Sequence, residues 1–567
     1  MSLKILRASC WVPFFWLAWY ISGLDPQNPL FDQWALVEFY RDVKMGDAGW
    51  RDLLEPHNNV HQIGFARLVL TAVALTSGLD FKAEIWLSMI IVIATVFVMG
   101  KMMDRAGVGD EPAVHIARLF CSVLLCSPVI YWPWVWSVGF FHFLVNLAII
   151  GAASLLARGT QGEPMSRNIL LAMVCCTVAS TTRAEGLASW LILSPQLFSY
   201  TRTLPRRITW RLAWFSGALL SGLLFAYSVA YLSQSQALPA PKIGSTLEDL
   251  MLSGLNALGL IGRPLGAGLQ PLASPDIPDP LLFMPIGALL TVAFLWLAWL
   301  QSRAQPSAIR DVAVAFIGVG IFGFCFSGAT MLARVGIGAF APFRPMMYSV
   351  TSLLVFMSVV NLGALRWSTH RARASNFERR ALIGSAIAIP LLLSAGYVVV
   401  GGDALERRTR SVGSGDCWEL IPHLAERNLC FFGLPDTRQV EMFERSGFRH
   451  TRKDVIKLEP TADPTWGAIE PQVSQHAGVF NRGVRGWVEP VAEGERPSVF
   501  IDIDGGLVGR ALVEPEENGR WRFSGKLHWP EDRSGEARAF LYDRSGGRLL
   551  PLSGKAILPP EEKQEEE

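Results

Sequence analysis

Residues 24–79 read LDPQNPLFDQWALVEFYRDVKMGDAGWRDLLEPHNNVHQIGFARLVLTAVALTSGL and interrupt an otherwise apolar half of the chain. The segment starts where a first apolar run ends and stops before the next run long enough to span a membrane. It holds seven acids and then two histidines: Asp25, Asp32, Glu38, Asp42, Asp47, Asp52 and Glu55, with His57 and His61. We expect it to lie on the outer face of a membrane and to carry an acid/base carboxylate.

The composition predicts a polytopic membrane protein. Of 567 residues, 51% are hydrophobic and only 18% are charged, below the ~25% of an average soluble domain. The mean hydropathy is +0.30. The sequence contains no glycine-rich phosphate loop, no CxxC pair and no GxSxG motif. It also has no basic stripe with interleaved aromatic residues, so a nucleic acid is not an expected partner.

A membrane span needs about 20 apolar residues. On this basis we predict eleven spans, near 8–23, 84–103, 114–131, 138–157, 168–182, 185–200, 211–232, 280–300, 312–331, 345–363 and 381–400. The first follows Lys4 and Arg7 but lacks a small-x-small cleavage site, so we interpret it as a retained span. Residues 1–402 then form one transmembrane domain with outer loops at 24–83 and 233–279.

The distribution of Lys and Arg predicts the orientation. With the N-terminus in the cytoplasm of a bacterium, every short loop assigned to the inside is basic. Treating residues 62–78 as a further span would turn the later basic loops outward. We therefore expect residues 51–78 to form helices at the outer interface, with Arg51, His57, His61 and Arg67 on a polar side. In the second outer loop, Ser245 and Glu248 fit a capping box that begins a helix.

After residue 402 the chain becomes polar and is expected to be exported. Residues 403–465 read as a small mixed α/β unit. Residues 475–558 read as an immunoglobulin-like β-sandwich, because short alternating strands are separated by glycine turns; the predicted strands are PSVFIDIDGG, LVGRALVEP, RWRFSGKLHW, ARAFLYDRSGG and RLLPLSGKAIL. The acidic tail 559–567 is expected to be disordered. Cys417 and Cys430 would form a disulfide closing a loop of about 14 residues, worth ~3 kcal/mol in the chain-entropy model.

Several residues could carry chemistry in the outer region. Asp32, among aromatic and aliphatic neighbours, could have a raised pKa and act as a general base; the alternative is an ordinary solvated acid. His57 and His61 have the i, i+4 spacing of metal ligands, but no third ligand is evident, so no metal site is predicted and they could instead bind phosphate or lie at the interface. Glu55 is a candidate supporting acid.

Three arginines interrupt apolar runs at predicted outer ends of spans, namely Arg183 in STTRAEG, Arg334 in TMLARVG and Arg344 in APFRPMM. A guanidinium at such a place suits a lipid-linked phosphate. The alternative is an arginine that reaches lipid headgroups. Glu185 is two residues from Arg183 and could support the site or simply pair with that arginine.

The layout resembles the GT-C superfamily of integral membrane glycosyltransferases. The resemblance covers residues 1–400 loosely and rests on four short stretches: FDQW around Asp32, WRDLLEPHNNVHQIGFARL, IWLSMIIVIATVFVMGKMMDRAG and TTRAEGL. In the second stretch Val60 and Gln62 stand where the family usually has an acid and an arginine.

The resemblance implies transfer of a hexose or pentose from a polyprenyl-phosphate donor to a glycan or lipid acceptor, on the outer face of the cytoplasmic membrane. Asp32 would then be the general base, and Arg183 or Arg344 would hold the donor phosphate. No cofactor is fixed by the sequence; a divalent cation, Mg²⁺ or Mn²⁺, is one that such a site could use. Other interpretations are a transporter or flippase, or a polymerase or ligase, of lipid-linked saccharides. A transporter would be expected to show ionisable residues in mid-span and repeat symmetry.

Overall fold

The structure, a computed structural model, describes residues 3–24, 26, 33–57, 62–157, 165–202, 204, 206–232, 246–267, 269, 279–302, 308–333, 348–370, 376–411, 456–457, 466–471, 474–475, 482–489, 497–504, 506–516, 520–527, 534–543 and 548–558. By their contacts the residues group into two units. The first, called here the helical unit, comprises 1–24, 47–77 and 82–408, and the second comprises 25–46, 78–81 and 409–567.

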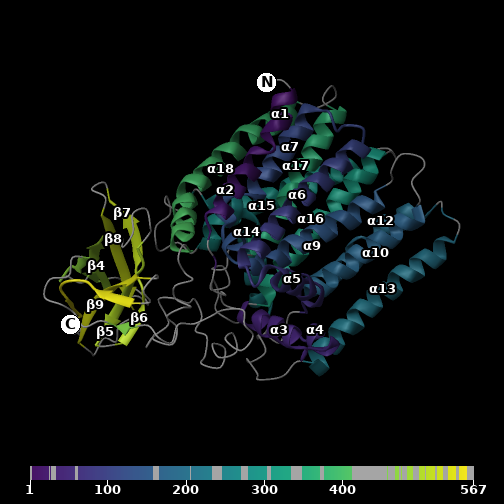
Figure 1. The fold of residues 1–567 in the computed structure, drawn as a ribbon. Coiled ribbons are helices and arrows are strands. Elements are labelled where there is room, and N and C mark those ends of the chain that lie inside the picture. Colours follow the sequence, from purple (N-terminus) through teal and green to yellow (C-terminus); the bar gives the residue numbers. More distant parts are fainter. Residues whose placement is uncertain are drawn as a thin grey trace. The chain divides into compact units, whose positions relative to one another are not determined.

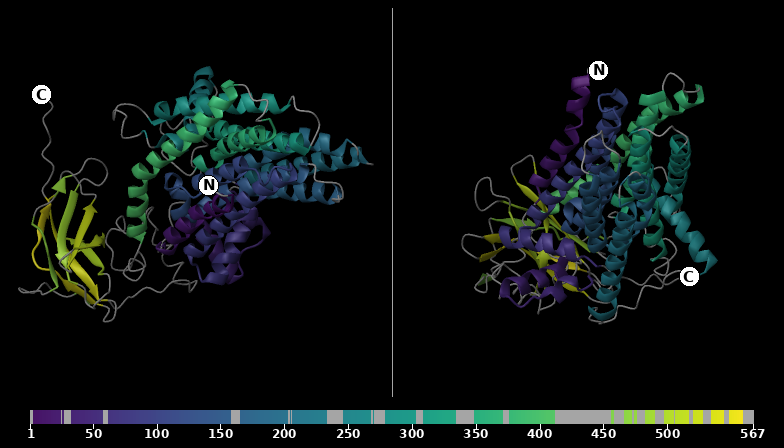
Figure 2. Two further views of the ribbon diagram at one scale, coloured as in Figure 1. Left: turned by 90° about the horizontal axis from the view of Figure 1, so that it is seen from above. Right: turned by 90° about the vertical axis from the view of Figure 1, so that its right-hand side faces the viewer.

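The helical unit is a bundle of long helices that lie side by side (Figures 1 and 2). Its α-helices are α1 Leu3–Ser9, α2 Val12–Ser22, α4 Trp50–Leu54, α5 Gly64–Ser77, α6 Phe81–Arg105, α7 Pro112–Leu125, α8 Trp132–Val135, α9 Phe140–Leu156, α10 Met165–Thr182, α11 Ala188–Ile192, α12 Ser194–Thr201, α13 Arg207–Tyr227, α14 Leu247–Gly266, α15 Asp279–Ser302, α16 Ala308–Leu332, α17 Ser349–His370 and α18 Asn376–Ser411. Shorter turns are η1 Pro128–Ile130, η2 Ser137–Gly139, η3 Ala184–Leu187 and the π-helical η4 Ser228–Leu232.

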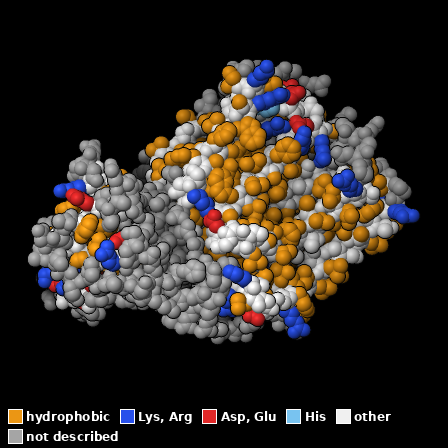
Figure 3. Space-filling view, viewed as in Figure 1, with side chains coloured by type: hydrophobic (Ala, Val, Ile, Leu, Met, Phe, Trp, Pro, Cys, Tyr) orange, Lys and Arg blue, Asp and Glu red, His pale blue; other side chains and the backbone are white. Residues whose placement is uncertain are grey.

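Among the described residues, six helices are long and apolar enough to cross a membrane. They are Phe81–Arg105, Ser137–Leu156, Arg207–Ala230, Leu281–Ser302, Ala308–Leu332 and Ser349–Thr369. Each overlaps one predicted span, which supports the assignment of the chain as a membrane protein. Hydrophobic side chains cover much of the visible face of the helical unit, and Lys and Arg lie mostly toward its edges (Figure 3).

The other five predicted spans are not among these six helices, and three of them are divided, so the count of eleven stays a prediction. Pro13 starts α2 anew after α1 within 8–23, and Pro128 follows the end of α7 within 114–131. The run 185–200 is divided into η3, α11 and α12, the last beginning at Ser194–Pro195. Proline favours the first helical turn because it has no N–H to donate, and this makes it a common point of division.

The helix predicted in the second outer loop is present as α14, but its predicted cap was wrong by one residue. Thr246, not Ser245, is the N-cap: its hydroxyl accepts from the Asp249 N–H at 3.0 Å, and the Asp249 carboxylate accepts from the Thr246 N–H at 3.1 Å. The Ser245/Glu248 and Thr246/Asp249 pairs have equal spacing, so the sequence pattern alone could not choose between them.

The second half of α14 is buried against α15, which was not expected of a loop helix. Glycines allow this close approach. A Cβ at Gly287 would lie 1.8 Å from the Leu258 carbonyl oxygen, and one at Gly262 would lie 2.1 Å from the Phe283 carbonyl oxygen. Small residues bring helix backbones together in this way within membranes. The hydroxyl of Ser352, in the first turn of α17, also donates to the Leu260 carbonyl at 3.2 Å.

The second unit contains α3 Gln33–Met45 and two β-sheets. One sheet has the order β1-β10-β9-β5-β6, with β11 on β9; the other has the order β2-β4-β8-β7, with β3 on β4. The strands are β1 Ile456–Lys457, β2 Gly467–Ile469, β3 Ser474–Gln475, β4 Arg482–Val488, β5 Val499–Ile503, β6 Gly506–Arg510, β7 Leu512–Pro515, β8 Trp521–Leu527, β9 Gly535–Asp543, β10 Arg548–Pro551 and β11 Ala556–Leu558.

The two sheets share one hydrophobic core, so they form a sandwich. Val484 and Phe523 from one sheet and Ile501 and Leu541 from the other are fully buried within it. β1 pairs with β10 in parallel, whereas the other strand pairs are antiparallel in the described part of the sheets. Strand β1 therefore brings residues of the predicted 403–465 segment into the same sheet as the residues that follow 475.

Candidate functional site

Arg183 lies at a sharp change in chain direction after α10. Helix α10 ends at Thr182, and Arg183 adopts an extended conformation with φ −155° and ψ 146° before η3 begins. The turn depends on Gly186, since a Cβ there would lie 2.1 Å from the Ala179 carbonyl oxygen. The sequence RAEG thus folds η3 back onto the end of α10 and carries the side chains of Arg183 and Glu185 with it.

The guanidinium of Arg183 contacts two side chains through all three of its nitrogens. Its Nη2 donates to Glu185 Oε1 at 2.8 Å and its Nε donates to Oε2 at 3.2 Å, which is a two-point ion pair. Its Nη1 lies 3.2 Å from His142 Nε2. The side chains of Arg183 and Glu185 are 8% and 15% exposed, so solvent screens the pair little. The expected pairing of Glu185 with Arg183 is present.

His142 extends this network into the bundle. Because arginine can only donate, Nε2 of the neutral imidazole accepts from Arg183, and the ring hydrogen is therefore on Nδ1. Nδ1 lies 3.2 Å from the Thr351 hydroxyl oxygen, to which it then donates. The His142 ring makes edge contacts with Phe326 and Tyr348, each with a centroid distance of 5.8 Å. The four polar side chains Arg183, Glu185, His142 and Thr351 are called the Arg183 cluster below.

The Arg183 cluster gathers four elements at one end of the helical unit, where α9 and α17 begin and where α10 ends. The guanidinium also lies over the Phe326 ring of α16 at 5.4 Å. One turn along α9 from His142, the Asn146 amide donates to the Val350 carbonyl at 3.0 Å. Next to the cluster, Thr182 Oγ1, Ser349 Oγ and Asn146 Oδ1 are buried without a hydrogen-bond partner. This end of the bundle is therefore unusually rich in polar groups.

His57 lies beside the same helix as His142 but on a different side of it. It is 4% exposed, and its ring meets Phe141 edge-on at a centroid distance of 6.5 Å. Arg67, also buried, donates to the Leu53 carbonyl at 3.2 Å and so holds the end of α4. The predicted common polar side of residues 51–78 was therefore wrong. Arg51 is exposed, whereas His57 and Arg67 are buried, because the His57 ring packs against Phe141 and Arg67 bonds to the end of α4.

The remaining sequence candidates are only partly described. Glu55 forms the C-terminal cap position of α4. Asp32, His61, Arg334, Arg344, Cys417 and Cys430 lie outside the described residues. Within the described ranges no group of three or more His, Cys, Asp or Glu side chains is arranged to hold a metal ion.

Sequence reasoning missed the residues that surround Arg183. His142 interrupts the apolar run FFHFLVN, and an ionisable residue within a span was the available signal. Glu84 gave a similar signal and is buried in the first turn of α6. Thr351 and Asn146 gave none, because hydroxyl and amide side chains are common in spans and their partners lie far away in the sequence.

Comparison with known proteins gives no match: no family model, no curated protein and no solved structure matches this chain.

Proposed function

We propose that this protein is a membrane glycosyltransferase that moves a sugar from a polyprenyl-phosphate carrier to a glycan or lipid acceptor on the outer face of the cytoplasmic membrane. The observation that supports this most is Arg183, a buried arginine held at a fixed position where several apolar helices begin or end. A guanidinium near the bilayer surface offers a permanent charge and a planar fork, which suit the phosphate of a lipid carrier.

In this proposal the charge of the leaving phosphate grows as the sugar–oxygen bond breaks. Arg183 would stabilise that charge with little reorganisation, because His142 and Thr351 hold its side chain in advance. The base that takes the proton of the acceptor hydroxyl would be Asp32, with Arg344, Arg334, His57 and His61 as further candidates for phosphate binding. The second unit would be exported and would lie on the acceptor side.

The purified chain in lipid nanodiscs provides the test. Wild-type protein is expected to release polyprenyl phosphate from a polyprenyl-phosphate sugar when an acceptor glycan is present, and Asp32→Asn is expected to abolish transfer without changing the melting temperature. A matched control is Asp104→Asn, which alters an acid paired with Arg118 at 3.0 Å in another part of the helical unit. Near-normal transfer by Asp32→Asn would remove Asp32 as the base.

A flippase or transporter of lipid-linked saccharides is the second candidate, and one observation favours it. His142 lies within a helix long enough to cross the membrane and is bonded to a buried ion pair, as ionisable residues in transport pathways are. Proteoliposomes separate the two functions. Movement of a fluorescent polyprenyl-phosphate sugar between leaflets, with no change in its covalent structure, would favour transport over transfer.

A further inference from the structure

We propose that Glu185 is an exchangeable internal anion that occupies the fork of Arg183 until the phosphate of the lipid carrier replaces it. This inference rests on the proposed function and adds a competitor within the chain itself. The two oxygens of Glu185 take the Nε and Nη2 positions at 3.2 and 2.8 Å, and two oxygens of a phosphate would need the same positions.

Of the five N–H donors of the guanidinium, Glu185 holds two and His142 holds one, so the two-point edge formed by Nε and Nη2 is occupied. A phosphate that binds this edge with two oxygens must displace Glu185. His142 is fixed between helices by Thr351, Phe326 and Tyr348, and it carries no negative charge to exchange. Glu185 lies on the short η3 turn, and its side chain is the more exposed of the ion pair. Glu185 is the group that leaves.

At the arginine one anion replaces another, so the guanidinium never lies buried without a partner, and the displaced Glu185 carboxylate turns outward from η3 into solvent, where its side chain is already 15% exposed. This matters because an uncompensated buried charge is costly, whereas the net worth of a buried pair is small. The Glu185 carboxylate thus stabilises Arg183 while no phosphate is bound, and it lowers the affinity of the site for the lipid carrier. Lower affinity favours release of the polyprenyl phosphate after the sugar has been transferred.

The test measures the dissociation constant of a polyprenyl phosphate for the full chain in nanodiscs. Glu185→Gln keeps the shape of the side chain but removes the competing charge, so affinity is expected to rise about tenfold, equivalent to ~1.4 kcal/mol. Arg183→Gln is expected to lose binding, and Glu185→Gln should then have no effect in the Arg183→Gln background. Asp104→Asn, at the exposed ion pair with Arg118, should leave carrier affinity unchanged.

A second variant protects the test against loss of folding in Glu185→Gln. Glu185→Asp keeps the charge but shortens its reach to the fork, and it is expected to bind the carrier more tightly than wild type. Unchanged or weaker affinity in a folded Glu185→Gln, or in Glu185→Asp if the first variant does not fold, overturns the exchange.

Two further ligands identify the source of the phosphate. The neutral polyprenol should respond to none of these substitutions. Inorganic phosphate that binds as well as the lipid would overturn the assignment to a lipid carrier. If wild type transfers sugar but substitutions of Glu185 leave carrier affinity unchanged, the exchange is overturned and the proposed function is kept. Absence of both transfer and carrier binding would overturn the proposed function together with it.

Discussion

Arg183 has its charge neutralised by the nearest acid in the sequence and its third nitrogen bonded to a histidine 41 residues away. The local part of this arrangement, the pair with Glu185, holds the charge in a region where water is excluded. The distant part, through His142 to Thr351, fixes the direction in which the fork points. A substitution at either end should therefore have a different effect: loss of stability at Glu185, and loss of orientation at His142.

Replacing Glu185 by Ala should destabilise the helical unit by about 3–5 kcal/mol, because the buried guanidinium is left without a counter-charge. Asp104→Ala is the comparison, since the Arg118–Asp104 pair is 22% and 43% exposed and an exposed pair is worth about 0–1 kcal/mol. Denaturation midpoints of both variants in one detergent measure the difference. An equal loss of stability in the two variants would mean that Arg183 pairs with another group when Glu185 is absent.

Glu536 of β9 should make the second unit sensitive to acid. Hydrogen bonds from Lys555 and Arg538 lower the pKa of this carboxyl below its usual value. A lowered pKa in the folded state means that the stabilisation is present above the unfolded pKa and is lost as the pH falls through the folded pKa. Hydrogen exchange of β9 and β11 should be faster in Glu536→Gln than in wild type at neutral pH. The exchange rates of the two proteins should become equal in acid. A difference that stays the same at every pH would show that the charge of Glu536 is not its cause.

Helix α14 shows how glycine decides whether an element lies on a surface or inside a bundle. Its first half exposes Leu247, Leu250 and Met251, whereas its second half is buried against α15. The change occurs where Leu258 meets Gly287, since any side chain at position 287 would collide with the backbone of α14. The position of α14 therefore depends on a residue of its neighbour, and not only on its own apolar pattern.

Gly287→Ala should separate α14 from α15 and destabilise the helical unit by about 1–3 kcal/mol, the usual cost of overpacking. Gly254→Ala is the matched control within α14, because a Cβ there meets nothing within 4 Å. That substitution should be neutral or stabilise the helix by about 0.8–1.0 kcal/mol. Thermal melting in detergent compares the two, and a similar effect of both would show that the close approach is not needed.

At the scale of the whole molecule, the chain forms two units with separate cores. The helical unit buries apolar residues between helices, and it also exposes many, such as Leu219 and Leu223 on α13, as expected of a face in contact with lipid. The sandwich of the second unit buries its apolar residues between two sheets. These cores share no residues, so damage to one should leave the other intact.

Phe523→Ala, which empties the centre of the sandwich, should cost the second unit about 3–5 kcal/mol. Hydrogen exchange followed by mass spectrometry reports both units in one sample. Peptides from β4, β8 and β9 should lose protection, while peptides from α9 and α16 should keep theirs. Loss of protection in both units would mean that they fold as one.

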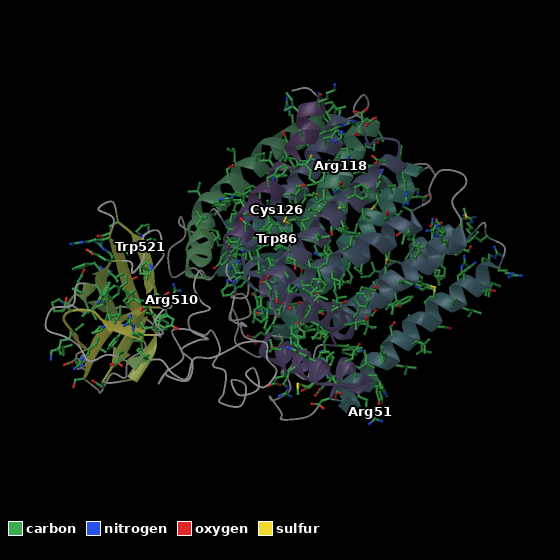
Figure 4. The ribbon with its side chains drawn as sticks, in the orientation of Figure 1. Arg51, Trp86, Arg118, Cys126, Arg510 and Trp521 are labelled. Atoms are coloured by element: carbon green, nitrogen blue, oxygen red, sulfur yellow. The ribbon has the colours of Figure 1, made fainter. Side chains whose placement is uncertain are left out.

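Arg51 and Arg118, labelled in Figure 4, lie at opposite ends of the helical unit. Six long helices were predicted correctly since each is one continuous apolar run. The divisions at Pro13 and Pro195 were missed because hydropathy averages over a single proline.

In the second unit the strands β5, β8 and β9 lie within the predicted stretches PSVFIDIDGG, RWRFSGKLHW and ARAFLYDRSGG, since each is a short run of strand-forming residues. Strand β4 was missed because RGVRGWV contains two glycines, although Gly486 is required there: a Cβ would lie 2.3 Å from the Phe523 ring. The site was only half predictable for a similar reason. The Arg183–Glu185 pair is local, whereas His142 and Thr351 join it only through packing of distant helices.

The stretch LVGRALVEP, expected as one strand, supplies β6 to one sheet and β7 to the other, with Ala511 at the crossing and its N–H bonded to the Val499 carbonyl at 2.8 Å. Two consecutive strands, separated by one residue, thus belong to different sheets of the sandwich. Under a pulling force, neither sheet could separate without pulling on the other, because β6 and β7 are joined directly through Ala511. The sandwich should therefore rupture in a single mechanical event.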